Sequence, residues 1–231
     1  ILHNNDWERP IYFTGGSYDD SEYFWMKDYL QLDGLVYKLV PIKTPIDPNN
    51  PYQMGRIDTD VMYDIVMKWD WGNSDSPDIY HDPETRKNSI SFRSNITRLA
   101  KTLIDEGQKE KAITVLDLAM EKMPIESFGY YSLVVPIAAA YYRAGALDKA
   151  QKIVTIIASG YEEYMRYYAQ WNRDEQLMLM EDIVGNVERY KSLLTEIVEA
   201  KDHKSMTALY DSFFESIIPF SYIYGEYDFY T

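Results

Sequence analysis

Acidic side chains between residues 58 and 78 are the first candidates for chemistry in this sequence. Asp58, Asp60 and Asp64 lie close together where a helix is predicted to begin, and gathered carboxylates can act as general acids and bases or bind a cation. A structural explanation competes, because Asp58 and Thr59 are suited to cap the helix and complement its dipole. A soluble enzyme that uses these acids is therefore our last-ranked hypothesis.

The loop that follows contains a second group of oxygen ligands of the types that calcium prefers. This group comprises Asp70, Asn73, Asp75 and Asp78. Their spacing does not match the calcium loop D-x-[DN]-x-[DN]-G followed by Glu, so a polar turn is the simpler interpretation. We therefore expect no metal and no cofactor. If calcium did bind here, it would raise the melting temperature of the chain.

Nucleophile–histidine catalysis has few candidates. The chain contains no cysteine and three histidines, His3, His81 and His203. A catalytic base needs a positioned nucleophile or an orienting partner, which the sequence indicates for none of them. The sequence also lacks the phosphate-loop, dinucleotide-binding, serine-hydrolase and zinc-protease motifs. We expect no catalytic residue in this chain.

Tyrosine is the most unusual feature of the composition, with 22 tyrosines among 231 residues. On the inner helices of a helical-repeat protein, tyrosine rings offer contact area and their hydroxyls offer hydrogen bonds to a bound peptide. The same rings could instead fill gaps between helices, which is the favoured alternative, and they could also stack on a sugar. The candidates for a binding groove are Tyr130, Tyr131, Tyr141, Tyr142, Tyr167 and Tyr168.

Charge and cysteine content exclude several classes of protein. The chain carries 23 basic and 37 acidic residues, a net charge of −14 at pH 7. Nucleic acids and anionic membrane surfaces bind clustered lysine and arginine, so neither is an expected partner. The absence of cysteine excludes disulfides and cysteine–zinc sites. The longest nearly apolar stretch, residues 133–142, is far shorter than the ~20 residues that span a bilayer.

The pattern of elements changes near Asp82. The first part, residues 1–81, is rich in proline and glycine and predicts a small α/β segment. The expected elements are a strand over residues 10–14, a helix from Asp19 to Leu30 that a capping box with Glu22 starts, a strand over residues 35–40 and a helix over residues 59–69.

Residues 82–231 have the period of amphipathic helices and contain a repeat. A shift of 38 residues aligns residues 106–112 with residues 144–150, including a glycine that ends one helix and an alanine that packs in the next. Small residues at these places are typical of tetratricopeptide repeats, whose period is about 34 residues. We therefore predict a mostly α fold of tetratricopeptide-like hairpins, preceded by the small α/β segment.

The C-terminal region is predicted to remain helical while the repeat fades beyond Gly160. One long helix over residues 174–200 and a partner over residues 205–218 would form a degenerate hairpin that caps the array, as solenoids require. Before it, a helical face continues through Tyr161, Tyr164, Tyr168 and Trp171. The predicted domains are thus residues 1–81 and residues 82–231.

A series of short motifs resembles a known family. The series consists of Trp7-x-Arg9-Pro10-Ile11-Tyr12-Phe13, residues 29–41, residues 60–64, Trp71-Gly72-Asn73 and the helical motif at residues 136–145. It resembles the region after the last membrane span in a family of large bacterial multi-pass membrane proteins. Their membrane domain is similar to C-type glycosyltransferases that use lipid-linked sugars, including protein O-mannosyltransferase-like enzymes. The catalytic acids of such enzymes lie in the membrane domain, so the resemblance transfers no catalytic residue to this chain.

The resemblance implies a soluble, non-catalytic domain on the periplasmic side of the inner membrane. It would assist in binding an acceptor, a protein or peptide partner, or the parent membrane domain, and would reach the membrane only through a part that precedes Ile1. The chain starts without methionine or a signal-peptide pattern, so we expect a piece of a longer protein. The alternative is a free-standing tetratricopeptide scaffold that binds peptides in a tyrosine-lined groove, for which a basic peptide would suit the net charge.

Overall fold

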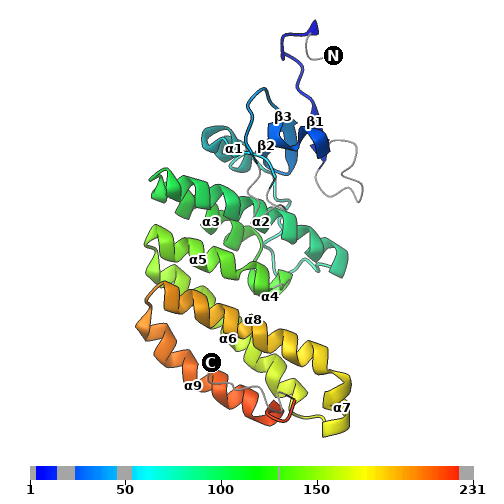
Figure 1. Cartoon of the computed structure of the whole chain (residues 1–231), viewed down its shortest axis with the longest axis vertical. Coiled ribbons are helices and arrows are strands. Elements are labelled where there is room, and N and C mark those ends of the chain that lie inside the picture. The colour runs from blue at the N-terminus through cyan, green and yellow to red at the C-terminus, as the bar shows by residue number, and fades with distance from the viewer. Residues whose placement is uncertain (1–3, 15–23, 46–53, 130, 224–231) are drawn as a thin grey trace. The chain divides into compact units, whose positions relative to one another are not determined.

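The chain is mostly helical with a small α/β segment near its N-terminus, as predicted, and the strands of that segment form an antiparallel sheet (Figure 1). The chain divides into two compact units, residues 1–129 and residues 130–231. The computed structural model describes residues 4–14, 24–45, 54–129 and 131–223. None of the helices within these ranges is both long and apolar enough to cross a membrane.

A three-stranded antiparallel sheet begins the first unit. Its strands are β1 (Tyr12–Thr14), β2 (Leu30–Asp33) and β3 (Val36–Leu39), in the spatial order β1-β3-β2. In the middle of the sheet, Tyr37 of β3 pairs with Phe13 of β1 and with Leu32 of β2. The strands predicted near residues 10–14 and 35–40 are therefore confirmed.

The helix predicted to extend to Leu30 is wrong at its C-terminal end. Residues Phe24–Tyr29 form a 3-10 helix, η3, and Leu30 begins β2. All four residues of β2 are buried, so this strand lacks the apolar–polar alternation by which a half-buried strand is recognised. The capping box that was predicted to start the helix, Asp19 with Glu22, lies outside the described residues.

Side chains of α2 (Pro83–Asp105) connect the sheet region to the first helical hairpin. The Asn95 amide donates to the carbonyl of Gly34 at 2.9 Å. The Arg98 guanidinium donates to the carbonyls of Met54 and Gly55 at 2.7 and 2.9 Å. One acceptor lies in the turn between β2 and β3 and the other two follow the sheet in sequence, and the sheet and α2 belong to one unit. The helix α1 (Thr59–Val66) lies between them in sequence and packs on both α2 and β2.

The helices α2 and α3 (Lys109–Lys122) form the first hairpin, as predicted. The carboxylate of Asp82 accepts from the backbone N–H groups of Glu84 and Thr85 and so caps α2, with Pro83 at the first helical position. The apolar stripes of both helices are buried, from Ile96 on α2 to Ala119 on α3. After α3 the chain forms one further short helix, α4 (Ile125–Phe128).

In the second unit, α5 (Val135–Ala144) and α6 (Leu147–Tyr168) form a hairpin that repeats the first, after a short 3-10 helix, η4 (Tyr131–Leu133). Gly107 and Gly145 follow the first helix of each pair and have left-handed backbones, with φ of +80° and +87°. Ala112 and Ala150, five residues further on, are fully buried in the second helix of each pair. Residues aligned by the sequence repeat therefore have the same structural roles.

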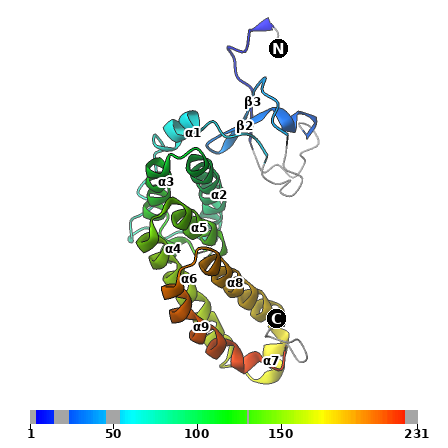
Figure 2. The ribbon, with the colours of Figure 1, turned by 60° about the vertical axis from the view of Figure 1, so that its left-hand side comes forward.

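The remaining helices are α7 (Arg173–Met178), α8 (Met180–Glu199) and α9 (His203–Ile217), followed by a 3-10 helix, η5 (Ile218–Phe220). The single helix predicted over residues 174–200 is wrong, because the helix is interrupted at Leu179. The N–H of Leu179 bonds to the carbonyls of both Glu175 and Gln176, a tightening that ends α7. Three helices, α6, α8 and α9, pack against one another and enclose the core of this unit (Figure 2).

The proposed boundary near Asp82 and the division at Gly129 describe different properties. The first marks the change from a proline-rich sequence to a helical one, and the second separates two groups of packed elements. The first hairpin follows the first boundary but belongs to the same compact unit as the sheet. A separate domain over residues 82–231 stays a prediction.

Candidate functional site: an aromatic pocket on α6

The six tyrosines predicted to line a groove have different places in the structure. Tyr141 is a core residue that is 2% exposed. Tyr142 is half-buried and belongs to a polar cluster around Asp202. Tyr130 lies outside the described residues, and Tyr131 lies in η4. The last two, Tyr167 and Tyr168, come together on α6. Their role in binding stays a prediction.

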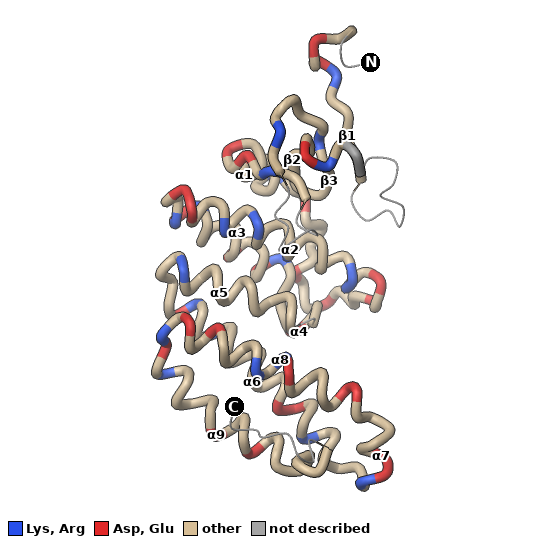
Figure 3. The backbone as a smooth tube through the Cα atoms, viewed as in Figure 1, with Lys and Arg blue, Asp and Glu red and all other residues tan. Residues whose placement is uncertain are grey.

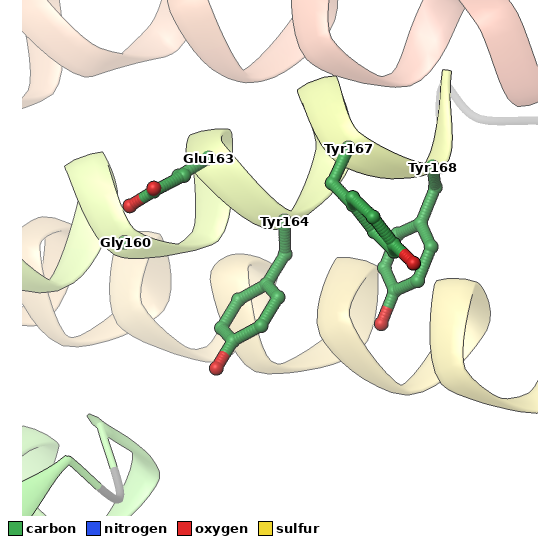
Figure 4. Close-up of a pocket in the computed structure, with 5 residues that line it drawn as sticks. All are labelled: Gly160, Glu163, Tyr164, Tyr167 and Tyr168. Carbon is green, nitrogen blue, oxygen red and sulfur yellow. The ribbon is translucent and has the colours of Figure 1, made fainter. Parts of the chain in front are cut away.

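Tyr167 and Tyr168 line a pocket of about 410 Å³ on the C-terminal half of α6. The described residues of this α6 pocket are Gly160, Glu163, Tyr164, Tyr167 and Tyr168. Figure 4 shows the three rings projecting from the same side of the helix, while the Glu163 carboxylate points toward Gly160. Gly160 has no side chain to fill the space, so one end of the pocket is carboxylate and the other is aromatic.

The rings of the pocket are held by contacts with one another. Tyr164 stacks on Tyr168 with ring centroids 6.5 Å apart, and Tyr167 contacts Tyr168 edge to face at 5.6 Å. Trp171 continues the group beyond the end of α6, with its ring 5.9 Å from that of Tyr167. Tyr168 is 8% exposed, whereas Tyr164, Tyr167 and Trp171 are 44%, 50% and 39% exposed. One ring therefore anchors the group in the core, and three offer their surfaces to solvent.

Tyr168, the buried ring of the pocket, is bonded to the neighbouring helix α8 through its hydroxyl. It accepts a hydrogen bond from the amide of Asn186 on α8 at 3.3 Å. Burial raises the pKa of Tyr168, and the nearby carboxylate of Asp182 raises it further. Neither Glu163 nor Asp182 forms an ion pair with any residue that the structure describes. The surroundings of the rings are therefore negative.

A second, more polar pocket of about 330 Å³ lies between α5 and α8. It is lined by Ala139, Tyr142, Arg143, Glu196, Glu199 and Ala200. Next to it the buried carboxylate of Asp202 accepts hydrogen bonds from the Tyr142 hydroxyl at 2.8 Å, from the Gln151 amide at 3.0 Å and from the N–H of Ser205 at 3.2 Å. Burial, and then the hydrogen bond to Asp202, raise the pKa of Tyr142. These groups satisfy one another at the start of α9, so their evident role is structural.

The acidic residues at the start of α1 have structural partners. Asp58 accepts from the N–H of Val61 and caps the helix, as the alternative interpretation held. Asp60 pairs with Lys111 at 3.2 Å, and Asp64 pairs with Lys68 at 3.9 Å. The three carboxylates therefore face different partners.

The loop between α1 and α2 is also a structured turn. Asp70 accepts from the N–H of Gly72 at 3.0 Å, and Asp75 pairs with Lys122. His81 is buried against Phe128, with its Nε2 atom 2.9 Å from the carbonyl of Ser74. Over the described parts of the chain, no three side chains of the metal-binding types are grouped closely enough to hold an ion.

Periodicity could have indicated the aromatic group of the pocket and Trp171 beyond it. Tyr164, Tyr167, Tyr168 and Trp171 follow the i, i+3, i+4, i+7 spacing of one helical face. An aromatic helical face of this kind is normally buried in the core. The sequence does not show that the neighbouring helices leave part of this face exposed. Glu163 was not predicted, because one acid among 37 carries no signal of its own.

The comparisons with known proteins concern the N-terminal part of the chain. Residues 1–61 match the family model described as TMEM260-associated domain 2. No curated protein and no solved structure matches the chain. The segment that holds the three-stranded sheet and the first residues of α1 is therefore similar to a domain associated with TMEM260.

Proposed function

We propose that this chain is a non-catalytic, extracytoplasmic part of a multi-pass membrane protein with a glycosyltransferase-like membrane domain. The observation that supports this most is the match of residues 1–61 to TMEM260-associated domain 2. The motif series that begins at Trp7 and the motif at residues 136–145 resemble proteins of the same kind. In a bacterium, the chain would lie in the periplasm beside the inner membrane.

The role of this part would be to bind an acceptor or a protein partner. Helical hairpins present extended surfaces with little backbone to rearrange, which is why repeat proteins often serve in recognition. The α6 pocket supports this role, since two of its three rings, and Trp171 beyond them, are solvent-exposed, and tyrosine and tryptophan are enriched at binding sites. Tyrosines of the predicted groove that lie in this pocket, Tyr167 and Tyr168, would contact the partner.

The test uses the protein encoded by the whole source gene, with a tag at the C-terminus. We expect the tag in the membrane fraction after an alkaline carbonate wash. For a bacterial source, protease added to intact spheroplasts should remove the tag and spare a cytoplasmic marker. Release of the tag by the wash would contradict the membrane anchorage, and protection from protease would contradict the periplasmic side.

The non-catalytic assignment has its own measurement in the same protein. Replacing Asp60 and Asp64 with asparagine removes the acids that an enzyme would use and costs only exposed ion pairs. We expect any transferase activity of the parent protein to stay within twofold. A loss of activity with unchanged protein levels would assign a catalytic role to these acids.

A free-standing tetratricopeptide-like scaffold is the second candidate. The matched roles of Gly107 with Gly145 and of Ala112 with Ala150 favour it, because they are what stacked repeats require. Such a scaffold should be recovered in the wash of the fractionation experiment and should capture a peptide without any membrane. The two candidates therefore differ in one measurement.

A further inference from the structure

The α6 pocket combines aromatic faces with uncompensated negative charge. Tyr164, Tyr167 and Trp171 expose parts of their rings, and each ring face carries the negative lobe of its quadrupole. Glu163 lines the other end of the pocket. No lysine or arginine is found among the described lining residues. Every charged or polarised group of the described pocket therefore favours a positive ligand.

The neighbouring helix strengthens this preference. The α8 sequence contains five acidic and two basic residues, and Asp182 lies in its first turn (Figure 3). Through Asn186, α8 also bonds to the hydroxyl of Tyr168, so the buried ring of the pocket is held in place. A cation at the rings would thus meet a negative potential from two helices.

We propose that the α6 pocket binds the lysine or arginine side chain of a basic peptide segment. A cation within about 6 Å of an aromatic face is attracted by the negative lobe of the ring quadrupole, and arginine also stacks on the ring. The Glu163 carboxylate would accept the hydrogen bonds of the ammonium or guanidinium group. This inference rests on the binding role proposed above and names the chemistry of the partner.

The pocket fits a cationic side chain better than a sugar or a lipid surface. A sugar needs several donors and acceptors around the stacking ring, whereas the described polar groups here are tyrosine hydroxyls and one carboxylate. An anionic membrane surface would be repelled by Glu163 and Asp182. The net charge of −14 would also attract a basic segment at long range.

The experiment measures binding of the full 231-residue chain to labelled glycine–serine peptides by fluorescence anisotropy. The peptides carry several lysines, several arginines or, at the same positions, glutamines. We expect the lysine and arginine peptides to bind and the glutamine peptide to bind at least about tenfold more weakly. Binding should weaken at higher salt, as expected for partly exposed charges.

Variants locate the site on the molecule. The double variant Tyr164→Leu/Tyr167→Leu should lower the affinity for the basic peptides about tenfold, and Glu163→Gln should lower it about threefold. The matched controls are Tyr80→Leu, at a tyrosine that is 83% exposed in the first unit, and Glu215→Gln on α9. Both controls should bind like the unaltered chain. Far-ultraviolet circular dichroism would establish that each variant is folded.

Several outcomes would overturn the inference. If the glutamine peptide binds as tightly as the basic peptides, or if no peptide binds, a cationic side chain is not the ligand of the pocket. Equal losses in the control variants would show a diffuse charge effect instead of a site. Binding of maltotriose or of phosphatidylcholine vesicles that depends on Tyr164 and Tyr167, in place of the basic peptides, would assign the pocket to another ligand class. The fractionation experiment can succeed or fail independently of all these results.

Discussion

Arg93 is a buried cation that holds the ends of two helices together. It is 0% exposed, and its two terminal nitrogens donate to the carbonyls of Gly129 at 2.7 Å and Met123 at 2.8 Å. These carbonyls lie at the C-caps of α4 and α3, the negative ends of the helix dipoles. Burial lowers the pKa of Arg93 to about 10, so the side chain stays charged at neutral pH.

Replacing Arg93 should therefore be costly. In Arg93→Ala, two carbonyls lose their donors and a cavity forms, so we expect the free energy of unfolding to fall by about 2–4 kcal/mol. The free energy of unfolding of Arg93→Lys should lie between those of Arg93→Ala and the unaltered chain, because one ammonium group cannot reproduce the two hydrogen bonds of the guanidinium group. Urea denaturation measures both, with Lys68→Ala at an exposed ion pair as the control. A loss in Arg93→Ala no larger than in Lys68→Ala would show that the buried bonds contribute little.

Asp202 makes the stability of the second unit depend on pH. Burial by itself raises the pKa of Asp202, but the hydrogen bonds from Ser205, Tyr142 and Gln151 outweigh it and hold the pKa below the ordinary 3.8. A carboxyl with a lowered folded pKa contributes stability that is fully present above its unfolded pKa. That contribution is lost as the pH falls from about 3.8 through the folded pKa.

The variant Asp202→Asn tests this linkage. Its amide can keep some hydrogen bonds but not the charge, so we expect a loss of about 1–3 kcal/mol at pH 7. The difference in stability from the unaltered chain should shrink toward pH 3. At that pH the Asp202 carboxyl of the unaltered chain takes up a proton when the chain unfolds, and this favours unfolding. Urea denaturation at both pH values gives the two differences. An equal difference at pH 7 and pH 3 would contradict a role for the charge.

At the scale of elements, the two hairpins should respond alike to the same change. Gly107 and Gly145 have φ of +80° and +87°, and a Cβ atom at either would meet no neighbour within 4 Å. Alanine there should therefore cost only backbone strain, about 1 kcal/mol in each case. Thermal unfolding measures the cost. The control Gly185→Ala, inside α8, should be stabilising. Costs that differ several-fold between Gly107→Ala and Gly145→Ala would argue against equivalent repeats.

The helices were predictable where one face is buried and the other is exposed to solvent. This holds for α2, α3 and α9, whose apolar stripes or caps stand out in the sequence. It fails for β2, which is buried on both faces, and for the break at Leu179, where every neighbouring residue is a good helix former. In both cases the outcome depends on tertiary contacts and not on the local pattern.

The candidate site was predictable only in part, for the same reason. Periodicity placed Tyr141 and Tyr168 on helical faces, but both are buried, and it could not tell that Tyr164 and Tyr167 stay exposed. Which face of a helix is left uncovered depends on the length and position of its neighbours. Part of the negative charge around the rings comes from Asp182 of α8, a segment that the sequence does not connect to α6.

At the scale of the whole molecule, the open question is which elements unfold together. The composition divides the chain near Asp82, and the packing of the elements divides it at Gly129. The two divisions disagree on the first hairpin, α2 with α3. A continuous repeat array would couple this hairpin to the second one, because stacked repeats stabilise their neighbours.

Hydrogen exchange of the Arg93→Ala variant distinguishes these cases. If residues 1–129 unfold as a unit, faster exchange should extend from α2 and α3 into the sheet and α1, because Asn95 and Arg98 bond these segments to α2. Amides of α6, α8 and α9 should then exchange as in the unaltered chain. If residues 82–231 form one cooperative domain, faster exchange should extend to the amides of α6 and α8, and the amides of the sheet should exchange as in the unaltered chain. Asp202→Asn provides the reciprocal perturbation, and we expect its effect to remain within residues 131–223, since the helices that surround Asp202 pack mainly on one another.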